Sequence, residues 1–188
     1  FERSMSLLQL DYIDLFGFHG INSDVELEHT LKCWDKAAQW KKEGRIRHIG
    51  FSTHGLSPAI EKAIQTDLFE YVNLHWFYIQ QEKWQSIVEA RKRDMGVFII
   101  SANDKGGMLS QSPDKLMELC APLHPMVFNG LFCLGQTLNN EPAIHTLSCG
   151  VSRPEDFDLH METVDKMDQA AALTAPIVER LEQAMADK

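Results

Sequence analysis

The 188-residue sequence has few cysteines, and their spacing supports none of the usual cysteine-based sites. The four cysteines, Cys33, Cys120, Cys133 and Cys149, form no Cys-x-x-Cys pair, so neither a zinc nor an iron–sulfur site is predicted. Scattered thiols of this kind are typical of a reducing compartment, so we expect a cytoplasmic protein without a bound metal.

Long apolar runs, basic stripes and two common motifs are also missing from the sequence. No run reaches the roughly 18 apolar residues of a membrane-spanning helix, and no secretion signal opens the chain. No stripe of lysine and arginine is present, so we expect neither a membrane nor a nucleic-acid partner. The Gly-x-Ser-x-Gly motif of hydrolases and the Gly-x-Gly-x-x-Gly motif of Rossmann folds are absent as well.

The acidic charge is concentrated at the C-terminal end. The net charge of the chain is −9, and residues 154–188 hold nine acidic residues against three basic ones, which accounts for −6 of it. The rest of the sequence is close to neutral. We interpret residues 154–188 as acidic helices that face solvent.

Short apolar runs recur along the chain and alternate with stretches of helical periodicity. Continuous apolar runs of this length are typical of strands that are buried on both faces in a parallel sheet. The expected strands are Tyr12–Phe18, Ile46–Phe51, Tyr71–Trp76, Val97–Ile100 and His145–Cys149. The expected helices are Val25–Lys42, one that opens at Ser57-Pro58 with Ser57 as N-cap, Glu82–Arg93, Met126–Leu138, one that opens at Arg153-Pro154, and Ala170–Ala186.

This alternation predicts an α/β fold with a parallel sheet, either doubly wound or closed into a (β/α)8 TIM barrel. The missing Gly-x-Gly-x-x-Gly motif favours the barrel. A barrel has eight strands and about 250 residues. We therefore expect residues 1–188 to be one domain that forms the C-terminal portion of a TIM barrel, with about five βα units, and three further units before Phe1.

Polar or glycine residues close the expected strands, or lie within them, at similar places. They are His19, Ser52, Asn73, Ser101 and Gly150. The active sites of α/β barrels lie at the carboxyl ends of the strands. If the barrel forms, these five residues meet at one mouth, and we take them as the candidate site.

Two segments resemble the aldo-keto reductase family. DYIDLFGFHG (Asp11–Gly20) resembles the family pattern tDYIDLyqlH, and GRIRHIGFSTHG (Gly44–Gly55) resembles GkiRyiGvSn. The resemblance implies a TIM barrel that reduces an aldehyde or ketone with NADP or NAD as cofactor. It places His19 at the histidine that orients and polarises the substrate carbonyl, where an imidazole N–H stabilises the negative charge that develops on oxygen.

The resemblance also implies a set of cofactor-binding residues. The family's Ser-Asn pair, which holds the nicotinamide carboxamide, is Ser52-Thr53 here, and Asn73 replaces the family's glutamine. The stretch SANDKGGML (Ser101–Leu109) resembles the pyrophosphate loop SPLggGll, and GVSRPEDFDLH (Gly150–His160) resembles the adenosine-phosphate segment GaSspeqleeN. These two segments contribute the cofactor candidates Ser101, Lys105, Gly106, Gly150, Ser152 and Arg153.

Several positions depart from the family pattern. Ile100 replaces an aromatic residue that often stacks on the nicotinamide, and His160 replaces an asparagine that contacts adenine. Asp156 stands where many members have a basic residue or glutamine, and its charge would repel the 2′-phosphate of NADP(H). NAD(H) is therefore expected to be tolerated at least as well as NADP(H).

The catalytic Asp, Tyr and Lys that the resemblance implies belong to strands that would precede Phe1. Tyr12, Tyr71 and Tyr78 lie outside the matching motif, so we expect residues 1–188 alone to be inactive. The alternatives are a non-catalytic binding or regulatory barrel subunit of the same fold and an incomplete fragment without activity. The expected partner is a small-molecule carbonyl substrate, and assembly into a homo-oligomer is left open.

Overall fold

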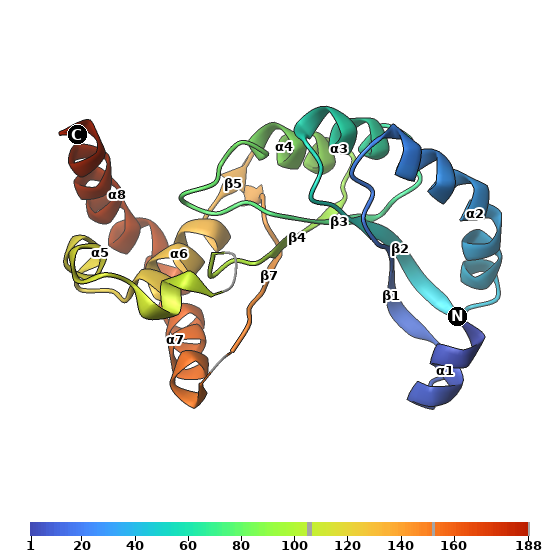
Figure 1. Ribbon diagram of the computed structural model, residues 1–188, viewed down its shortest axis with the longest axis horizontal. Coiled ribbons are helices and arrows are strands. Elements are labelled where there is room, and N and C mark those ends of the chain that lie inside the picture. Colours follow the sequence, from blue (N-terminus) through green and yellow to red (C-terminus); the bar gives the residue numbers. More distant parts are fainter. Residues whose placement is uncertain (105–106, 152, 188) are drawn as a thin grey trace. The chain divides into compact units, whose positions relative to one another are not determined.

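The computed structural model describes residues 1–104, 107–151 and 153–187, and the chain divides into two compact units (Figure 1). The first unit consists of Phe1–Leu74 and Lys83–Val97. The second consists of His75–Glu82 and the chain from Phe98 onward. The sequence predicted a single domain over 1–188, and that organisation remains a prediction.

The first unit is built of parallel strands with helices between them. In chain order its elements are α1 (Glu2–Leu8), β1 (Ile13–Phe18), α2 (Asp24–Lys42), β2 (Ile46–Ser52), α3 (Ser57–Ile64), β3 (Tyr71–Leu74) and α4 (Trp84–Lys92). Strand β1 pairs with β2 in parallel, and β2 pairs with β3 in parallel. The register aligns Gly17 with Gly50, and Ser52 with Asn73, so the carboxyl ends of these strands lie side by side.

Helix α2 shows how local sequence sets the boundaries of these elements. The Ser23 hydroxyl accepts a hydrogen bond from the Val25 N–H at 3.2 Å and caps the first turn. Lysines 41 and 42 lie in the last turn, where positive charge complements the helix dipole. The chain then turns at Gly44, whose φ of 75° is left-handed and suits glycine.

Aromatic side chains pack the helices against one face of β1 and β2. The rings of Phe1 and Trp40 stack with centroids 4.0 Å apart, and those of Phe18 and Trp34 stack at 6.3 Å. Figure 1 shows α2, α3 and α4 along this side of the strands. Trp40 also meets Phe16 of β1, with ring centroids 6.2 Å apart, so Trp34 and Trp40 both pack α2 against this strand.

The second unit contains a further pair of parallel strands and a cluster of helices. Its elements are β4 (Gly96–Ile100), which begins in the first unit, η1 (Met108–Gln111), α5 (Asp114–Cys120), α6 (Pro125–Leu134), β5 (Thr137–Leu138), β6 (Glu141–Pro142), β7 (Thr146–Ser148), α7 (Pro154–Asp165), η2 (Met167–Gln169) and α8 (Ala170–Ala186). Strands β4 and β7 are parallel, with Ile100 beside Ser148. Leu131 and Ile177 are fully buried where α6 packs against α8.

The five expected strands are confirmed, with small differences at their ends. Three boundaries were wrong, two in helices and one in a strand. Helix α6 ends at Leu134 and not at residue 138, because the antiparallel pair β5–β6 follows it. Ser57 is the first helical residue, and Leu56 occupies the N-cap position without a side-chain bond. The strand that starts at Tyr71 ends at Leu74, two residues early.

The described residues supply five parallel strands and do not complete an eight-stranded barrel.

No single helix in the described part is long and apolar enough to cross a membrane, although α5 and α6, as a bent pair, together reach that length and composition.

Candidate active site

His19 and Ser52 meet at the carboxyl ends of β1 and β2 in the first unit. Nδ1 of His19 lies 2.9 Å from the Ser52 hydroxyl oxygen. The Gly20 N–H donates to the same oxygen at 3.3 Å, and the N–H groups of Gly20 and Ile21 donate to the Ser52 carbonyl at 3.1 and 3.0 Å. The turn after β1 is therefore tied to the end of β2, and the exposed imidazole is held by one nitrogen.

Thr53, the next candidate residue, is fully buried. Its hydroxyl donates to the Ile21 carbonyl at 2.6 Å and accepts the Gly55 N–H at 2.9 Å. Nearby, the Asn22 side chain accepts the His54 N–H at 2.7 Å. The Thr53 hydroxyl thus braces the two loops that present His19 and Ser52.

Asn73 brings a third polar group to this strand end. It is the register partner of Ser52, and its backbone carbonyl accepts the Thr53 N–H at 2.9 Å. Its side-chain oxygen Oδ1 is buried and has no hydrogen-bond partner among the described residues. Buried polar atoms are nearly always paired, so an unpaired amide oxygen beside Ser52 marks a place for a ligand group or a water.

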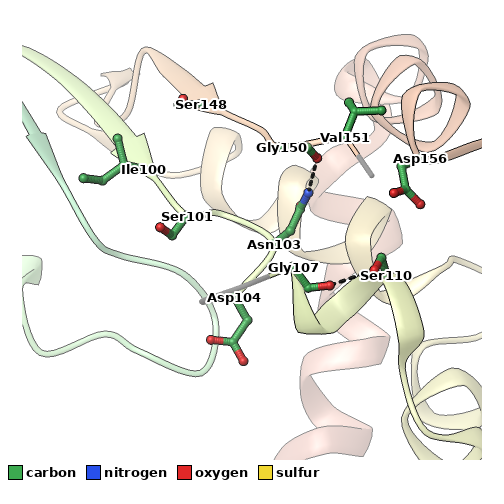
Figure 2. Close-up of a pocket in the computed structure, with 10 residues that line it drawn as sticks. All are labelled: Ile100, Ser101, Asn103, Asp104, Gly107, Ser110, Ser148, Gly150, Val151 and Asp156. Atoms are coloured by element: carbon green, nitrogen blue, oxygen red, sulfur yellow. Dashed lines mark hydrogen bonds between the residues drawn. The ribbon is translucent and has the colours of Figure 1, made fainter. Parts of the chain in front are cut away.

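The second unit contains a pocket of about 440 Å³ beyond the ends of β4 and β7 (Figure 2). Its walls come from the loop after β4, from η1, and from the segment between β7 and α7. The lining residues are Ile100, Ser101, Asn103, Asp104, Gly107, Ser110, Ser148, Gly150, Val151 and Asp156. Figure 2 shows the Ser110 hydroxyl donating to the Gly107 carbonyl, a bond of 2.8 Å that closes the glycine turn.

The backbone of the loop after β4 is tightly curled around this pocket. Ser101, Asp104 and Gly107 all have positive φ angles, of 56°, 61° and 74°. The Leu109 N–H donates to the Asn103 carbonyl at 3.1 Å. The Gly107 N–H also donates within the loop, to the Asp104 carbonyl at 2.8 Å, so these bonds hold the described part of the loop in a tight turn.

Asn103 joins this loop to the segment after β7. It is 7% exposed, and its amide nitrogen donates to the Gly150 carbonyl at 3.3 Å, as Figure 2 shows. The same nitrogen lies 3.2 Å from Nε2 of His160, which is itself 3.3 Å from the Gly150 carbonyl oxygen.

Arg153 and Asp156 form a compact ion pair at the start of α7. The Asp156 carboxylate accepts the Arg153 backbone N–H and a guanidinium N–H, each at 3.2 Å. A guanidinium N–H of Arg153 also lies 3.4 Å from the Ser110 carbonyl. Asp156 is 1% exposed, lines the pocket and has Arg153 as an ion-pair partner.

The structure groups the predicted site residues by unit. His19, Ser52, Thr53 and Asn73 lie together in the first unit, and Ser101 and Gly150 line the pocket of the second, beside Arg153. Lys105, Gly106 and Ser152 lie outside the described residues. Among the described residues, no group of three or more His, Cys, Asp or Glu side chains is placed to hold a metal ion.

Sequence reasoning missed two asparagines that shape these sites. Asn103 lines the pocket, and its departure from the leucine of the quoted SPLggGll pattern was an available signal. Asn129 in α6 is 3% exposed, accepts the Tyr78 N–H at 3.0 Å and donates to the Ala102 carbonyl, which fixes the loop next to Asn103. A lone asparagine in an apolar helix gave no sign of these partners.

Comparisons with known proteins identify relatives of the chain. The family model described as "Aldo/keto reductase family" matches residues 1–122. The Escherichia coli K12 protein named methylglyoxal reductase DkgA is 31% identical over 111 residues, which cover 50% of this chain and 38% of that protein. The Bacillus subtilis protein named uncharacterized oxidoreductase YqkF is 25% identical over 178 residues, which cover 83% of this chain and 56% of that protein.

Solved structures show the same fold. The holo form of the aldo-keto reductase AKR11C1 from Bacillus halodurans superposes with a TM-score of 0.75 at 17% identity, over 95% of this chain and 62% of that one. Aldose reductase from Giardia lamblia gives a TM-score of 0.64 at 15% identity, over 92% of this chain and 65% of that one. The chain thus spans between about two fifths and two thirds of the length of these relatives.

Proposed function

Because the chain belongs to the aldo/keto reductase family of oxidoreductases, we propose that it serves in the NAD(P)H-dependent reduction of an aldehyde or ketone. One observation supports this most directly. His19, Ser52 and the unpaired Asn73 oxygen occupy the carboxyl ends of three neighbouring parallel strands, where barrel enzymes carry their chemistry.

His19 is the residue that we propose to polarise the substrate carbonyl. In the proposed arrangement the Ser52 hydroxyl, which accepts the Gly20 N–H, donates its own hydrogen to Nδ1 of His19. A neutral imidazole that accepts at Nδ1 carries its hydrogen on Nε2. That Nε2–H would donate to the carbonyl oxygen and stabilise the negative charge that builds up there during reduction.

The first unit also fits a nicotinamide. The unpaired Oδ1 of Asn73 would accept an N–H of the carboxamide, and Ser52 lies beside it in register. When bound, the cofactor supplies the hydride. The side chains of this unit would bind and orient its nicotinamide end, as the family resemblance implies, while Thr53 supports the loops from beneath.

The second unit, taken by itself, offers a place for cofactor phosphates. Its pocket is about 440 Å³, the polar side chains of Ser101, Asn103 and Ser110 line it, and the N-terminal turn of α7, where an anion is favoured, reaches it at Asp156. The Asp156 carboxylate faces the same pocket, which disfavours the extra 2′-phosphate of NADP(H). We therefore propose that NAD(H) binds at least as well as NADP(H). The assignment of this pocket to the cofactor phosphates uses residues of the second unit only.

The proton that completes carbonyl reduction needs a donor that these residues do not provide. Burial raises the pKa of Tyr71 to about 12, with the Glu70 carboxylate adding to the effect, and burial also raises the pKa of Tyr78. A tyrosine suited to proton donation needs a pKa shifted toward neutrality. We therefore propose that residues 1–188 alone turn over slowly, and that efficient catalysis needs the Tyr and Lys implied by the family.

Fragments of the cofactor test the two assignments separately. Nicotinamide mononucleotide is expected to shift the side-chain amide resonance of Asn73 and the backbone amide of Ser52 in NMR spectra of the protein. ADP-ribose is expected to shift the side-chain amide of Asn103. If neither fragment shifts these resonances in folded protein at millimolar concentration, dinucleotide binding is ruled out and the proposed function is wrong.

A further inference from the structure

The contact between Asn103 and His160 joins two positions at which the chain departs from the family pattern. The quoted patterns have leucine at the position of Asn103 and asparagine at the position of His160. The two residues are 57 positions apart, yet Asn103 Nδ2 and His160 Nε2 lie 3.2 Å from each other. A leucine could not form this bond, so the contact requires a polar residue at position 103.

The hydrogen-bond geometry assigns distinct roles to the two side chains. The Asn103 amide has two hydrogens, and its nitrogen is within 3.3 Å of both the Gly150 carbonyl and His160 Nε2. Nε2 of His160 lies 3.2 Å from that nitrogen and 3.3 Å from the Gly150 carbonyl oxygen, so it accepts from Asn103 in one tautomer and donates to Gly150 in the other. In both tautomers Asn103 donates to Gly150, and His160 is hydrogen-bonded to one member of that pair.

The Gly150 carbonyl belongs to the wall of the second-unit pocket. A carbonyl oxygen carries partial negative charge, so one that points into an anion-binding pocket opposes the ligand. Because the peptide group is planar, a bond that fixes the Gly150 carbonyl also fixes the direction of the Val151 N–H. Asn103 is 7% exposed and is anchored by the Leu109 N–H on its own carbonyl, so it can hold this peptide firmly.

We propose that Asn103 and His160 act as a pair of positioning residues that set the affinity for the phosphate end of the dinucleotide. They do so by holding the Gly150 peptide in its binding orientation. The proposal rests on the proposed function, because it takes the second-unit pocket as the site of the cofactor phosphates.

The test is titration calorimetry of the protein with ADP-ribose. Asn103→Leu and His160→Leu are each expected to weaken binding about five- to tenfold, the scale of one or two lost hydrogen bonds. Since the residues act as a pair, the double variant should bind within about twofold of the weaker single variant. Met161→Leu, an exposed neighbour on α7, is the matched control and should bind like the wild type.

His160→Gln separates positioning from general damage to the fold. A glutamine side chain has an oxygen that can accept from Asn103 and an N–H that can donate to Gly150, so it should restore binding to within about twofold of the wild type. Circular dichroism checks that each variant is folded. If His160→Leu fails to fold, Asn103→Leu and His160→Gln still carry the test.

The outcomes distinguish the two levels of the account. If both leucine variants bind ADP-ribose as tightly as the wild type, the positioning role alone is wrong. The same holds if His160→Gln binds ADP-ribose as weakly as His160→Leu. If folded wild-type protein does not bind ADP-ribose, the assignment of the pocket to the cofactor is wrong, and the positioning role falls with it.

Discussion

The Ser52 hydroxyl and Nδ1 of His19 lie 2.9 Å apart and join the ends of two neighbouring parallel strands. The two residues are 33 positions apart in the chain, and the parallel pairing of β1 with β2 brings them together. The exposed ring therefore has a fixed orientation and a free Nε2. This combination suits a group that acts on a ligand more than one that stabilises the fold.

Replacement of His19 by leucine, which has no hydrogen-bond donor, should reduce carbonyl reduction far more than stability. The loss of one hydrogen-bond donor to a developing oxyanion costs about 10²- to 10³-fold in rate. The side chain is exposed, so the free energy of unfolding should change by less than about 0.5 kcal/mol. The measurements are alcohol formation at high protein concentration and the thermal midpoint. An unchanged rate would remove His19 from the active site, and a large loss of stability would show a structural role.

Gly50 is predicted to be the least replaceable glycine of the first unit. A Cβ at this position would lie 2.5 Å from the Tyr71 ring and from the Tyr71 carbonyl oxygen, so Gly50→Ala should destabilise the protein by at least about 1–3 kcal/mol. Gly17→Ala is the matched control, because its Cβ would meet only the end of the Tyr71 side chain, with the hydroxyl oxygen at 3.1 Å and Cζ at 3.9 Å. Urea unfolding measures both. Equal midpoints would show that Tyr71 does not lie across Gly50.

The Glu70 carboxylate should contribute stability that is lost in acid. Burial raises its pKa, but hydrogen bonds from Lys41, the Ile49 N–H and His48 outweigh this effect, so the pKa lies below its usual value of 4.5. A group with a lowered pKa in the folded state stabilises the protein above the unfolded pKa, and that contribution disappears as the pH falls through the folded value.

Glu70→Gln should therefore lower the thermal midpoint near pH 7 and have less effect below about pH 4. The loss near neutrality should not exceed about 1 kcal/mol, because the side chain is 37% exposed and solvent weakens the ion pair. The exposed Asp94→Asn variant serves as the control. A midpoint difference that persists unchanged into acid would contradict the ionic origin of the effect.

Asp156→Asn should shift the cofactor preference toward NADPH. The change removes a negative charge that faces the pocket, while the asparagine side chain can still accept the Arg153 backbone N–H. The ratio of NADPH affinity to NADH affinity is expected to rise about three- to tenfold, the scale of roughly 1 kcal/mol of charge repulsion. Parallel titrations with both cofactors measure it, and an unchanged ratio would place the 2′-phosphate away from Asp156.

The sequence predicted the parts of the fold that depend on short-range pattern. Apolar runs located the five strands, and a polar residue after each run located His19 and Ser52, because parallel strands end at the same edge. The hairpin β5–β6 was missed although Asn139 and Asn140 are a turn signal, and both have positive φ. We expected the helix that begins at Met126 to continue through Leu138, so the residues of β5 were assigned to that helix.

Contacts across the chain could not be predicted from pattern. The bonds of Asn103 to Gly150 and His160, and of Asn129 to Tyr78, join residues 47 to 57 positions apart. The buried state of Thr53, whose hydroxyl braces two loops, is equally invisible in a strand that simply ends in polar residues. Both depend on how separate loops meet once the strands have paired.

Calorimetric titration of the protein with NADH and NADPH tests the central claim most directly, because the proposed reduction depends on binding of a nicotinamide dinucleotide. The account predicts saturable binding of one molecule per chain, with NADH bound at least as tightly as NADPH and with weaker binding after Ser52→Ala. No heat of binding for either cofactor, with protein that unfolds cooperatively, would contradict the claim.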